Sequence, residues 1–239
     1  LVDADTVTGH VTMSLGIEQV RTVADSWRDH AEGGDQESLT TVASAHASGL
    51  SVVALTSSPL HTDILEPARV ADAITASRPT YDVIVVDLHP SYSALNKAIF
   101  AIADRILVPV TPDVPAIRAA VQLREVADEL GIQDHLSLVV NRANSGVSVA
   151  DMERTVGMAA LALIRSGGLL FVRAANEGRT VIEMFPRERV TADFDALAER
   201  VVRSDAAAPA SASASASATP ALRPAGFRLP FGRKEPARA

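Results

Sequence analysis

The stretch YDVIVVDLHP, residues Tyr81–Pro90, decides the fold, because it runs four consecutive β-branched residues into an acid. Such runs are typical of buried strands. An ionised carboxylate is costly at the edge of an apolar layer unless it is paired or close to a metal. In open parallel α/β sheets, ligands bind at the carboxyl ends of the strands. We therefore predict a buried strand over residues 83–86 and a functional site at Asp87.

Further apolar runs alternate with segments of helical spacing along the chain. This alternation implies right-handed βαβ crossovers, and the unbroken apolar runs are those of parallel strands that are covered on both faces. The predicted fold class is α/β, with a mostly parallel sheet and helices on both faces. We expect further strands at 50–55, 105–110 and 136–141, and helices at 66–77 and 114–131, the second of which ends at Gly131.

The composition sets limits on the function. With 239 residues and 47% hydrophobic content, the chain can bury a large core. A formal net charge of −7 argues against a protein that coats nucleic acid over its whole surface. The absence of cysteine excludes disulfides and thiolate metal sites. Because no apolar run approaches membrane-spanning length and no signal peptide is visible, we expect a cytoplasmic protein.

The chain divides near Ser204. Residues 1–203 hold the predicted α/β domain, whereas residues 204–239 form an Ala/Ser/Pro-rich segment with almost no large apolar residues until its basic end. Such a composition cannot offset the entropy of ordering, so we expect a disordered tail. The cations of the tail interleave with aromatic and aliphatic residues, a pattern that suits an anionic membrane surface or a partner. A solvated tail is the interpretation that we favour, because the composition is that of a disordered segment.

A chain that ends near Ser204 is expected to keep the stability of the intact protein, because the tail has almost nothing to bury. Thermal melts of the two forms test this expectation. A clear loss of melting temperature on truncation would show instead that the tail docks on the domain.

A second strand that ends in acids opens the chain. The stretch LVDADTVTGHVTMSLGIE runs from Leu1 through Asp3 and Asp5 to Gly9 and an apolar helix. It resembles the segment after the phosphate loop in the ParA/MinD superfamily of deviant-Walker ATPases. Three other segments resemble the same superfamily in the expected order: YDVIVVDLHPSYSALNKAIFAIADRILVPVTPDVPAIRA, LSLVVNRANSGVSVADMERTVG and VRAANEGRTVIEMFPRERVTADFDALAERV. With the opening stretch, the resemblance extends from Leu1 to Val201 and so along nearly the whole length of residues 1–203.

Within the superfamily, the chain is most similar to the CpaE/TadZ-type proteins of Flp (Tad) pilus assembly. The likeness rests on ASGLSVVALTSSP, NRANSGVSVADMERTVG and ANEGRTVIE. It implies an ATPase with ATP and Mg²⁺ as cofactors, a homodimer on ATP binding, pilus-assembly partners, and a place at the inner face of the membrane. Two alternatives stay open, because a fold alone does not choose a function. One is a partition or septum-placement ATPase, with DNA as a partner in partition, and the other is a non-catalytic scaffold.

The resemblance also assigns site residues. It makes Asp5 the acid that positions the attacking water and places Asp87 on Mg²⁺ through water. Asn141 would contact adenine with its amide, which both donates and accepts hydrogen bonds. Taken alone, Asp87 would also suit a helix N-cap, and Asn141 a turn at the end of a strand. The remaining residues, expected to line the base, are Pro109, Thr111 and Asp113.

Two departures from the family pattern stand out. His89 replaces a proline that usually precedes Pro90, so we expect a less rigid loop there. The Gly-rich loop with its lysine is also missing, because nothing in the 239 residues fits G-x-x-x-x-G-K-[ST]. Since the chain starts at Leu1 within a strand, we expect a fragment of an ATPase whose first strand and phosphate loop lie upstream. A natural pseudo-ATPase is the alternative.

Overall fold

The computed structural model describes residues 1–18, 20–29 and 38–205. Apart from Ser204 and Asp205, the tail predicted from the sequence lies outside the described residues, and so do residues 19 and 30–37. Within the described residues the strands are β1 (Val2–Asp3), β2 (Ser44–Ala45), β3 (Ser51–Ala54), β4 (Val86–Asp87), β5 (Ile106–Val110), β6 (Leu136–Asn141) and β7 (Ala160–Ile164).

Helices separate most of these strands, as the alternating pattern predicts. The α-helices are α1 (Val11–Ser14), α2 (Val23–Asp29), α3 (Pro67–Ser77), α4 (Ala94–Ile102), α5 (Val114–Glu129), α6 (Val149–Val156), α7 (Leu170–Asn176), α8 (Val181–Met184) and α9 (Arg189–Asp205). Short 3₁₀ turns lie at Leu39–Val42, Pro59–His61, Arg78–Thr80 and Gln133–His135. None of the described helices is long and apolar enough to cross a membrane.

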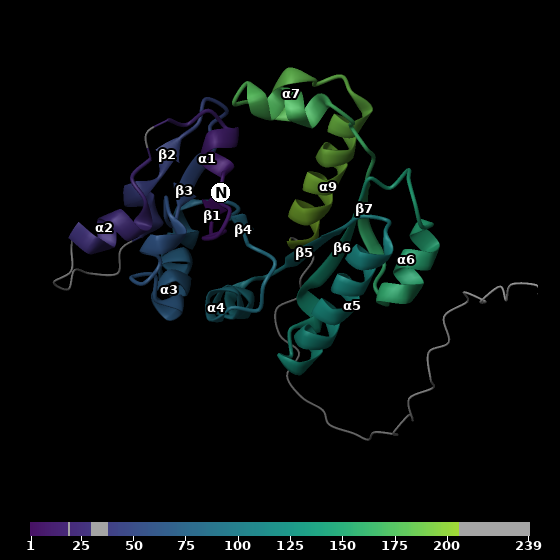
Figure 1. Cartoon of the computed structure of the whole chain (residues 1–239), viewed down its shortest axis with the longest axis horizontal. Helices are drawn as coiled ribbons and strands as arrows, with labels where there is room; N and C mark the ends of the chain where they lie inside the picture. The colour runs from purple at the N-terminus through teal and green to yellow at the C-terminus, as the bar shows by residue number, and fades with distance from the viewer. Residues whose placement is uncertain (19, 30–37, 206–239) are drawn as a thin grey trace, which may run out of the picture.

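The strands form two sheets that lie on either side of α4 (Figure 1). The first has the order β2-β3-β1-β4, and the second has the order β5-β6-β7. All pairs are parallel except β2 with β3. The α/β class and the mostly parallel pairing are therefore confirmed, but β4 and β5 do not pair, and the expected single sheet is interrupted between them.

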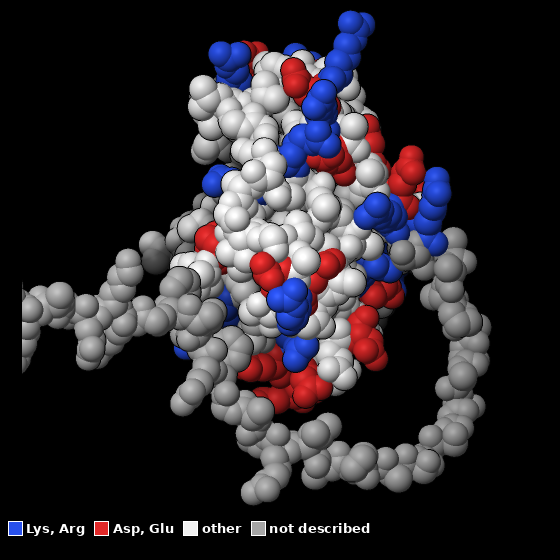
Figure 2. Space-filling view, turned by 90° about the vertical axis from the view of Figure 1, so that its right-hand side faces the viewer, with Lys and Arg blue, Asp and Glu red and all other residues white. Residues whose placement is uncertain are grey.

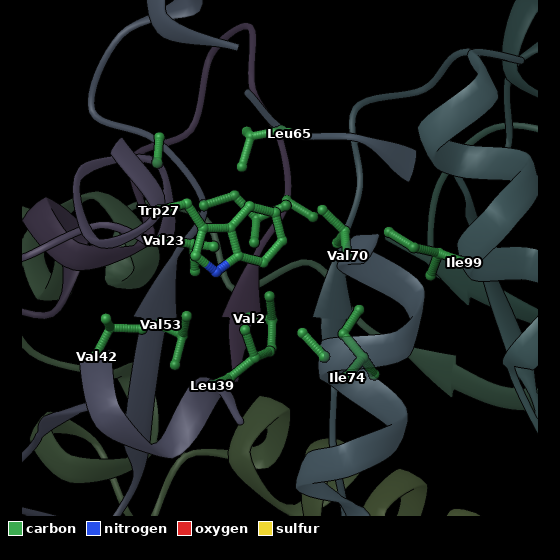
Figure 3. Packing of buried hydrophobic residues seen from close by; sticks show 14 residues of the cluster. Val2, Val23, Trp27, Leu39, Val42, Val53, Leu65, Val70, Ile74 and Ile99 are labelled. Carbon is green, nitrogen blue, oxygen red and sulfur yellow. The ribbon is translucent and has the colours of Figure 1, made fainter. Parts of the chain in front are cut away.

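The first core lies between β1, β3, α2 and α3. Trp27 of α2 is 2% exposed and lies among aliphatic residues of these elements (Figure 3). The guanidinium carbon of Arg69 lies 3.9 Å from the centroid of the Trp27 ring, which covers the outer side of this core with a cation–π contact. Such a large buried ring is expected to contribute much of the burial free energy of the first sheet.

Helix α4 connects the cores of the two sheets. Its residue Ile99 packs in the first core, and its neighbour Phe100 packs in the core between the second sheet and α5. On β6, Leu138 and Val140 face that second core, whereas Val139 faces a third core that includes residues of α9. Because successive side chains of a strand point to opposite faces, the second sheet is covered on both faces, as expected.

Three details differ from the predicted elements. Strand β4 begins at Val86 rather than at residue 83, because its only partner among the described strands is the short β1. The strands β2 and β7 are absent from the prediction. Helix α5 ends at Glu129, two residues before the expected end, and Gly131 follows with a φ of 69° that favours glycine.

Candidate functional site

The carboxyl ends of β1 and β4 bring two acids side by side. Asp3 and Asp87 are register partners in this parallel pair, so their side chains share one face. The amide of Val2 donates to the carbonyl of Val85 at 2.8 Å, and the amide of Ala4 donates to the carbonyl of Asp87 at 2.9 Å. The strand end that the sequence predicts for Asp87 is therefore confirmed, and a second acid lies beside it.

Asp5 lies in the turn that follows β1. Its Oδ1 accepts the amides of Val7 at 2.9 Å and Thr8 at 2.8 Å, and its Oδ2 accepts the hydroxyl of Thr8 at 2.6 Å. Nδ1 of His89 lies 3.4 Å from Oδ1. Burial alone would raise the pKa of this carboxyl, but these neighbouring donors lower it to about 2. Asp5 is thus anionic across the physiological range, and in this conformation it holds its own turn.

The structure gives Asp3 a role that the sequence reasoning did not assign. The side chain is buried, and it accepts the amides of Asp5 at 3.2 Å and Val11 at 3.0 Å. It therefore connects the end of β1 to the start of α1 and fixes the turn that carries Asp5. A sequence signal was present, because an acid at the end of an apolar strand needs a partner when it is buried.

Gly9 closes the same turn through a close approach of the backbone. Its amide donates to the carbonyl of Asp5 at 2.9 Å. A Cβ at this position would lie 2.4 Å from that carbonyl oxygen and 2.9 Å from Oδ1 of Asp3. A side chain at this position would collide with these two oxygens, so the turn requires glycine here.

Gly9→Ala is expected to destabilise the protein by about 1–3 kcal/mol, because backbone and a buried carboxylate must both move. Chemical denaturation of the two proteins measures this difference. Gly49→Asn is the matched control, because nothing lies within 4 Å of a Cβ there and asparagine tolerates the positive φ of 88°. An equal loss in both variants would mean that crowding at Gly9 is not the cause.

Asp87 is exposed at the end of β4 and crowded by like charges. Partial desolvation raises the pKa of its carboxyl, and repulsion from Asp3 and Asp5 raises it further. The helix-cap interpretation of Asp87 is wrong, because Oγ of Ser93 caps α4 by accepting the amide of Asn96 at 3.1 Å. The carboxylate of Asp87 is therefore available to a cation, which would relieve the repulsion.

A direct three-ligand metal site is absent from the part of the chain that the structure describes. The arrangement of Asp87 instead suits a cation held through water, because Mg²⁺ dehydrates reluctantly and often keeps several waters. The assignment of Asp87 to the water shell of Mg²⁺ stays a prediction.

The loop after β4 is anchored by a buried amide. Nδ2 of Asn96 donates to the carbonyls of His89 at 2.7 Å and Ser91 at 2.8 Å. Asn96 itself is only 3% exposed. The loop at His89, which was expected to be less rigid, is thus held by side-chain hydrogen bonds from α4 that the sequence did not indicate.

The residues expected at the base lie at the ends of β5 and β6. Pro109 is exposed in β5 and is the register partner of Val139. The hydroxyl of Thr111 donates to Oδ2 of Asp113, and Oδ1 of Asp113 accepts the amide of Ala116 at 3.0 Å. The hydrogen bond from Thr111 is the main cause of a lowered pKa at Asp113. Asp113 is thus the N-cap of α5, a structural role that the prediction did not include.

Asn141 ends β6 beside a strained residue. Arg142 has a φ of 55°, uncommon for a residue other than glycine. Its carbonyl accepts the amide of Ser145 at 3.1 Å and the hydroxyl of Ser145 at 2.9 Å, which closes the turn. The side chain of Asn141 forms no hydrogen bond with the described residues, so its amide is available to a ligand.

The loops after β5 and β6 pack against each other. The amide of Val147 donates to the carbonyl of Pro112 at 3.0 Å. Gly146 has a φ of 72°, and a Cβ there would lie 2.0 Å from the same carbonyl. These contacts place Thr111, Asp113 and Asn141 on one connected surface.

The predicted site residues therefore form two groups. Asp5 and Asp87 lie together at the end of the first sheet, and the four residues expected at the base lie together at the end of the second sheet. No hydrogen bond or ion pair of the described residues joins the two groups.

Comparison with known proteins supports one fold. No family model matches the chain. The septum site-determining protein MinD of Thermotoga maritima is 24% identical over 212 residues, which cover 84% of this chain and 75% of that protein. The crystal structure of a ParA family ATPase from Chlorobium tepidum superimposes with a TM-score of 0.74 at 20% identity and covers 84% of each chain.

A third similar structure contains a ligand. The septum site-determining protein MinD from Pyrococcus horikoshii, complexed with Mg-ADP, superimposes with a TM-score of 0.70 at 17% identity, over 84% of this chain and 81% of that one. At sequence identities of 17–24%, similarity of this kind shows that the backbones follow the same fold. The chain therefore has the α/β fold of the ParA/MinD ATPases.

Proposed function

We propose that the protein is a Mg-ATP-dependent ATPase of the ParA/MinD type that acts as a positioning factor. The observation that carries this proposal is the pairing of Asp87 with Asp3 at adjacent strand ends, with Asp5 in the next turn. This crowded group of carboxylates lies where open α/β sheets bind ligands. A MinD of the same fold is complexed with Mg-ADP, which supports an adenine nucleotide and Mg²⁺ here.

Asp87 and Asp5 have different proposed roles. Asp87 would hold the water shell of Mg²⁺, because it is exposed, is not used as a cap and is crowded by like charge. Bound Mg²⁺ would neutralise charge on the phosphates. Asp5 would orient the attacking water, because it stays anionic and the hydrogen bonds of its turn fix its position.

Asn141 is proposed to contact the adenine edge. Its side chain has both a donor and an acceptor, and it lies at the end of β6 next to a strained backbone. Pro109 and the Thr111–Asp113 turn would line the base from the neighbouring loop. Because the carboxylate of Asp113 is used within its own turn, we infer that this turn contacts the base by shape and backbone.

The phosphates need a cradle that the 239 residues do not contain. ATP hydrolysis depends on backbone amides and a lysine around the β- and γ-phosphates, and the sequence has no match to that loop. We propose that residues ahead of Leu1 supply it, and we call the protein with such a lysine-bearing segment the loop-bearing form. A non-catalytic scaffold is the alternative if no such segment exists.

The process that we propose is Flp (Tad) pilus assembly, in which an ATP-bound homodimer in the cytoplasm positions assembly partners at the inner face of the membrane. The sequence likeness to CpaE/TadZ-type proteins supports it. Septum placement is the second candidate, favoured by the 24% identity to MinD of Thermotoga maritima. Figure 2 does not support partition on DNA. On the face that it shows, the Lys and Arg side chains of the described residues are scattered among acids and form no continuous basic area.

Deletion of the gene in its own organism tests the proposed process. Pilus assembly predicts loss of surface pili in electron micrographs, with normal division and normal plasmid retention. An allele that encodes Asp5→Ala should reproduce that loss if ATP turnover is required, and an Asp82→Ala allele is the matched control. Misplaced septa with normal pili would contradict the pilus proposal in favour of septum placement.

A further inference from the structure

His89 reaches the carboxylate of Asp5 from the loop after β4. Its Nδ1 lies 3.4 Å from Oδ1 of Asp5, whereas the hydrogen bonds of that carboxylate come from Val7 and Thr8 within the same turn. The contact therefore connects the turn after β1 to the loop after β4, which follow two neighbouring strands (Figure 1). A proline, the usual residue of the family pattern at this position, has no side-chain nitrogen with which to make it.

The Nδ1 atom of His89 needs a partner. It is buried, and within the described residues it has no well-aligned hydrogen bond. Buried polar atoms are almost always hydrogen-bonded, and an exception calls for an explanation. Hydrogen bonds of catalytic groups are often long in the free protein and shorten in the complex with substrate. The contact of 3.4 Å with Asp5 suits a bond of that kind.

The backbone of His89 is held in place from α4. Nδ2 of Asn96 donates to the carbonyl of His89 at 2.7 Å and to the carbonyl of Ser91 at 2.8 Å. Asn96 is itself buried in the first turn of α4. Because an imidazole is rigid and has only two side-chain torsions, an anchored backbone leaves few positions for Nδ1. The position of Nδ1 beside Asp5 is therefore fixed by α4.

The charge of Asp5 favours one tautomer of His89. A carboxylate only accepts hydrogen bonds, whereas a neutral imidazole has one donor and one acceptor nitrogen. If Nδ1 were the acceptor, its lone pair would face Oδ1 of Asp5. The side chains of Asp5 and His89 are only 12% and 33% exposed, so little water screens that repulsion. The arrangement thus favours the proton on Nδ1.

We propose that His89 is a positioning residue of Asp5, because its Nδ1–H donates to Oδ1 and fixes the carboxylate that orients the attacking water. Val7 and Thr8 hold that carboxylate within its own turn, and His89 connects it to the loop that Asn96 anchors. This inference deepens the proposed function and rests on it for the reaction. The hydrogen bond and the tautomer themselves do not depend on ATP.

The first measurement is ¹⁵N NMR of the histidine rings in the 239-residue chain, at about pH 9, well above the ordinary range for histidine. We expect the proton on Nδ1 of His89 in the unmodified chain. Asp5→Ala should move it to Nε2, because the acceptor is gone. The ring of His46, whose Nδ1 lies 2.8 Å from the hydroxyl of Ser48, is the internal reference and should not change.

The second measurement is ATP turnover of variants at position 89 in the loop-bearing form. His89→Leu should lower kcat about tenfold and change KM less than about twofold, because a positioning group acts on the chemical step. His89→Asn should recover most of the loss, since its amide nitrogen is as many bonds from Cα as Nδ1. His89→Gln, whose amide nitrogen corresponds to Nε2, should behave like leucine. His46→Leu is the matched control at another partly buried histidine, and should keep normal kcat.

Four outcomes would overturn the proposal. One is a bare Nδ1 on His89 in the unmodified chain, and another is a tautomer that Asp5→Ala leaves unchanged. The third is normal kcat in His89→Leu. The last is that asparagine recovers no more turnover than leucine or glutamine, because the ring would then act through Nε2 or through its bulk. If the loop-bearing form has no turnover at all, the proposed function fails, and the NMR result still decides whether His89 holds Asp5.

Discussion

Asp5→Ala in the loop-bearing form is expected to lower ATP turnover at least ~100-fold, the scale of a positioned group that acts on the attacking water. Mg-ATP binding should change by less than about threefold, because Asp5 is proposed to act in the transition state and not to hold the ground state. Phosphate release and calorimetry on the same preparations measure the two effects. A large loss of binding together with turnover would remove Asp5 from the proposed role.

The turn geometry requires a second variant at this position. Asp5 accepts the amides of Val7 and Thr8, so alanine would also loosen the turn. Asp5→Asn retains an oxygen for those amides and removes the charge, and it should lose turnover nearly as much as alanine. Thr8→Val is the control, because it removes the hydroxyl on Oδ2 and leaves the carboxylate in place. Normal turnover in both Asp5 variants would contradict the assignment.

Asp87→Ala in the loop-bearing form is expected to weaken Mg-ATP binding at least about tenfold, the scale seen when outer-shell partners of a metal are removed. Nucleotide binding without Mg²⁺ should stay unchanged, because the carboxylate is proposed to act only through the water shell of the metal. The measurement is calorimetry with Mg²⁺ and with a chelator.

The charge of the site predicts a further result for the same variant. Desolvation and repulsion from Asp3 raise the pKa of Asp87 in the folded protein, so its ionised form opposes folding at neutral pH. Removal of the carboxylate should therefore not lower the melting temperature of the nucleotide-free protein. Asp82→Ala, at an exposed acid before β4, is the matched control. Equal loss of Mg-ATP binding in both variants would contradict a specific role for Asp87.

The elements with local signals are those that the sequence predicts well. The β-branched runs gave strands β3 and β6 almost to the residue, and Gly131 marked the end of α5 within two residues. Strand β7 escaped prediction because its sequence, ALALI, suits a buried helix as well as a strand. Strand β2 is only two residues long and has no pattern to detect.

The parts that depend on distant contacts could not be predicted. Asp87 was placed correctly, because the end of a strand is a local feature. The residue that caps α4, Ser93 and not Asp87, is determined by where the helix begins. The hydrogen bonds from Asn96 to the loop at residues 89–91 depend on how that helix packs. The interruption between β4 and β5 is a property of strand pairing and has no local signal in either strand.

The most direct test of the central claim is a calorimetric titration of Mg-ATP into two proteins, the chain of residues 1–239 and the loop-bearing form. The claim is that these residues supply the metal and base contacts of an ATP site whose phosphate cradle lies outside them. It predicts binding in the micromolar range for the loop-bearing form and no binding tighter than millimolar for the chain of 239 residues, a difference of about 4 kcal/mol. Micromolar binding by the 239-residue chain, or no binding by the loop-bearing form, would contradict it.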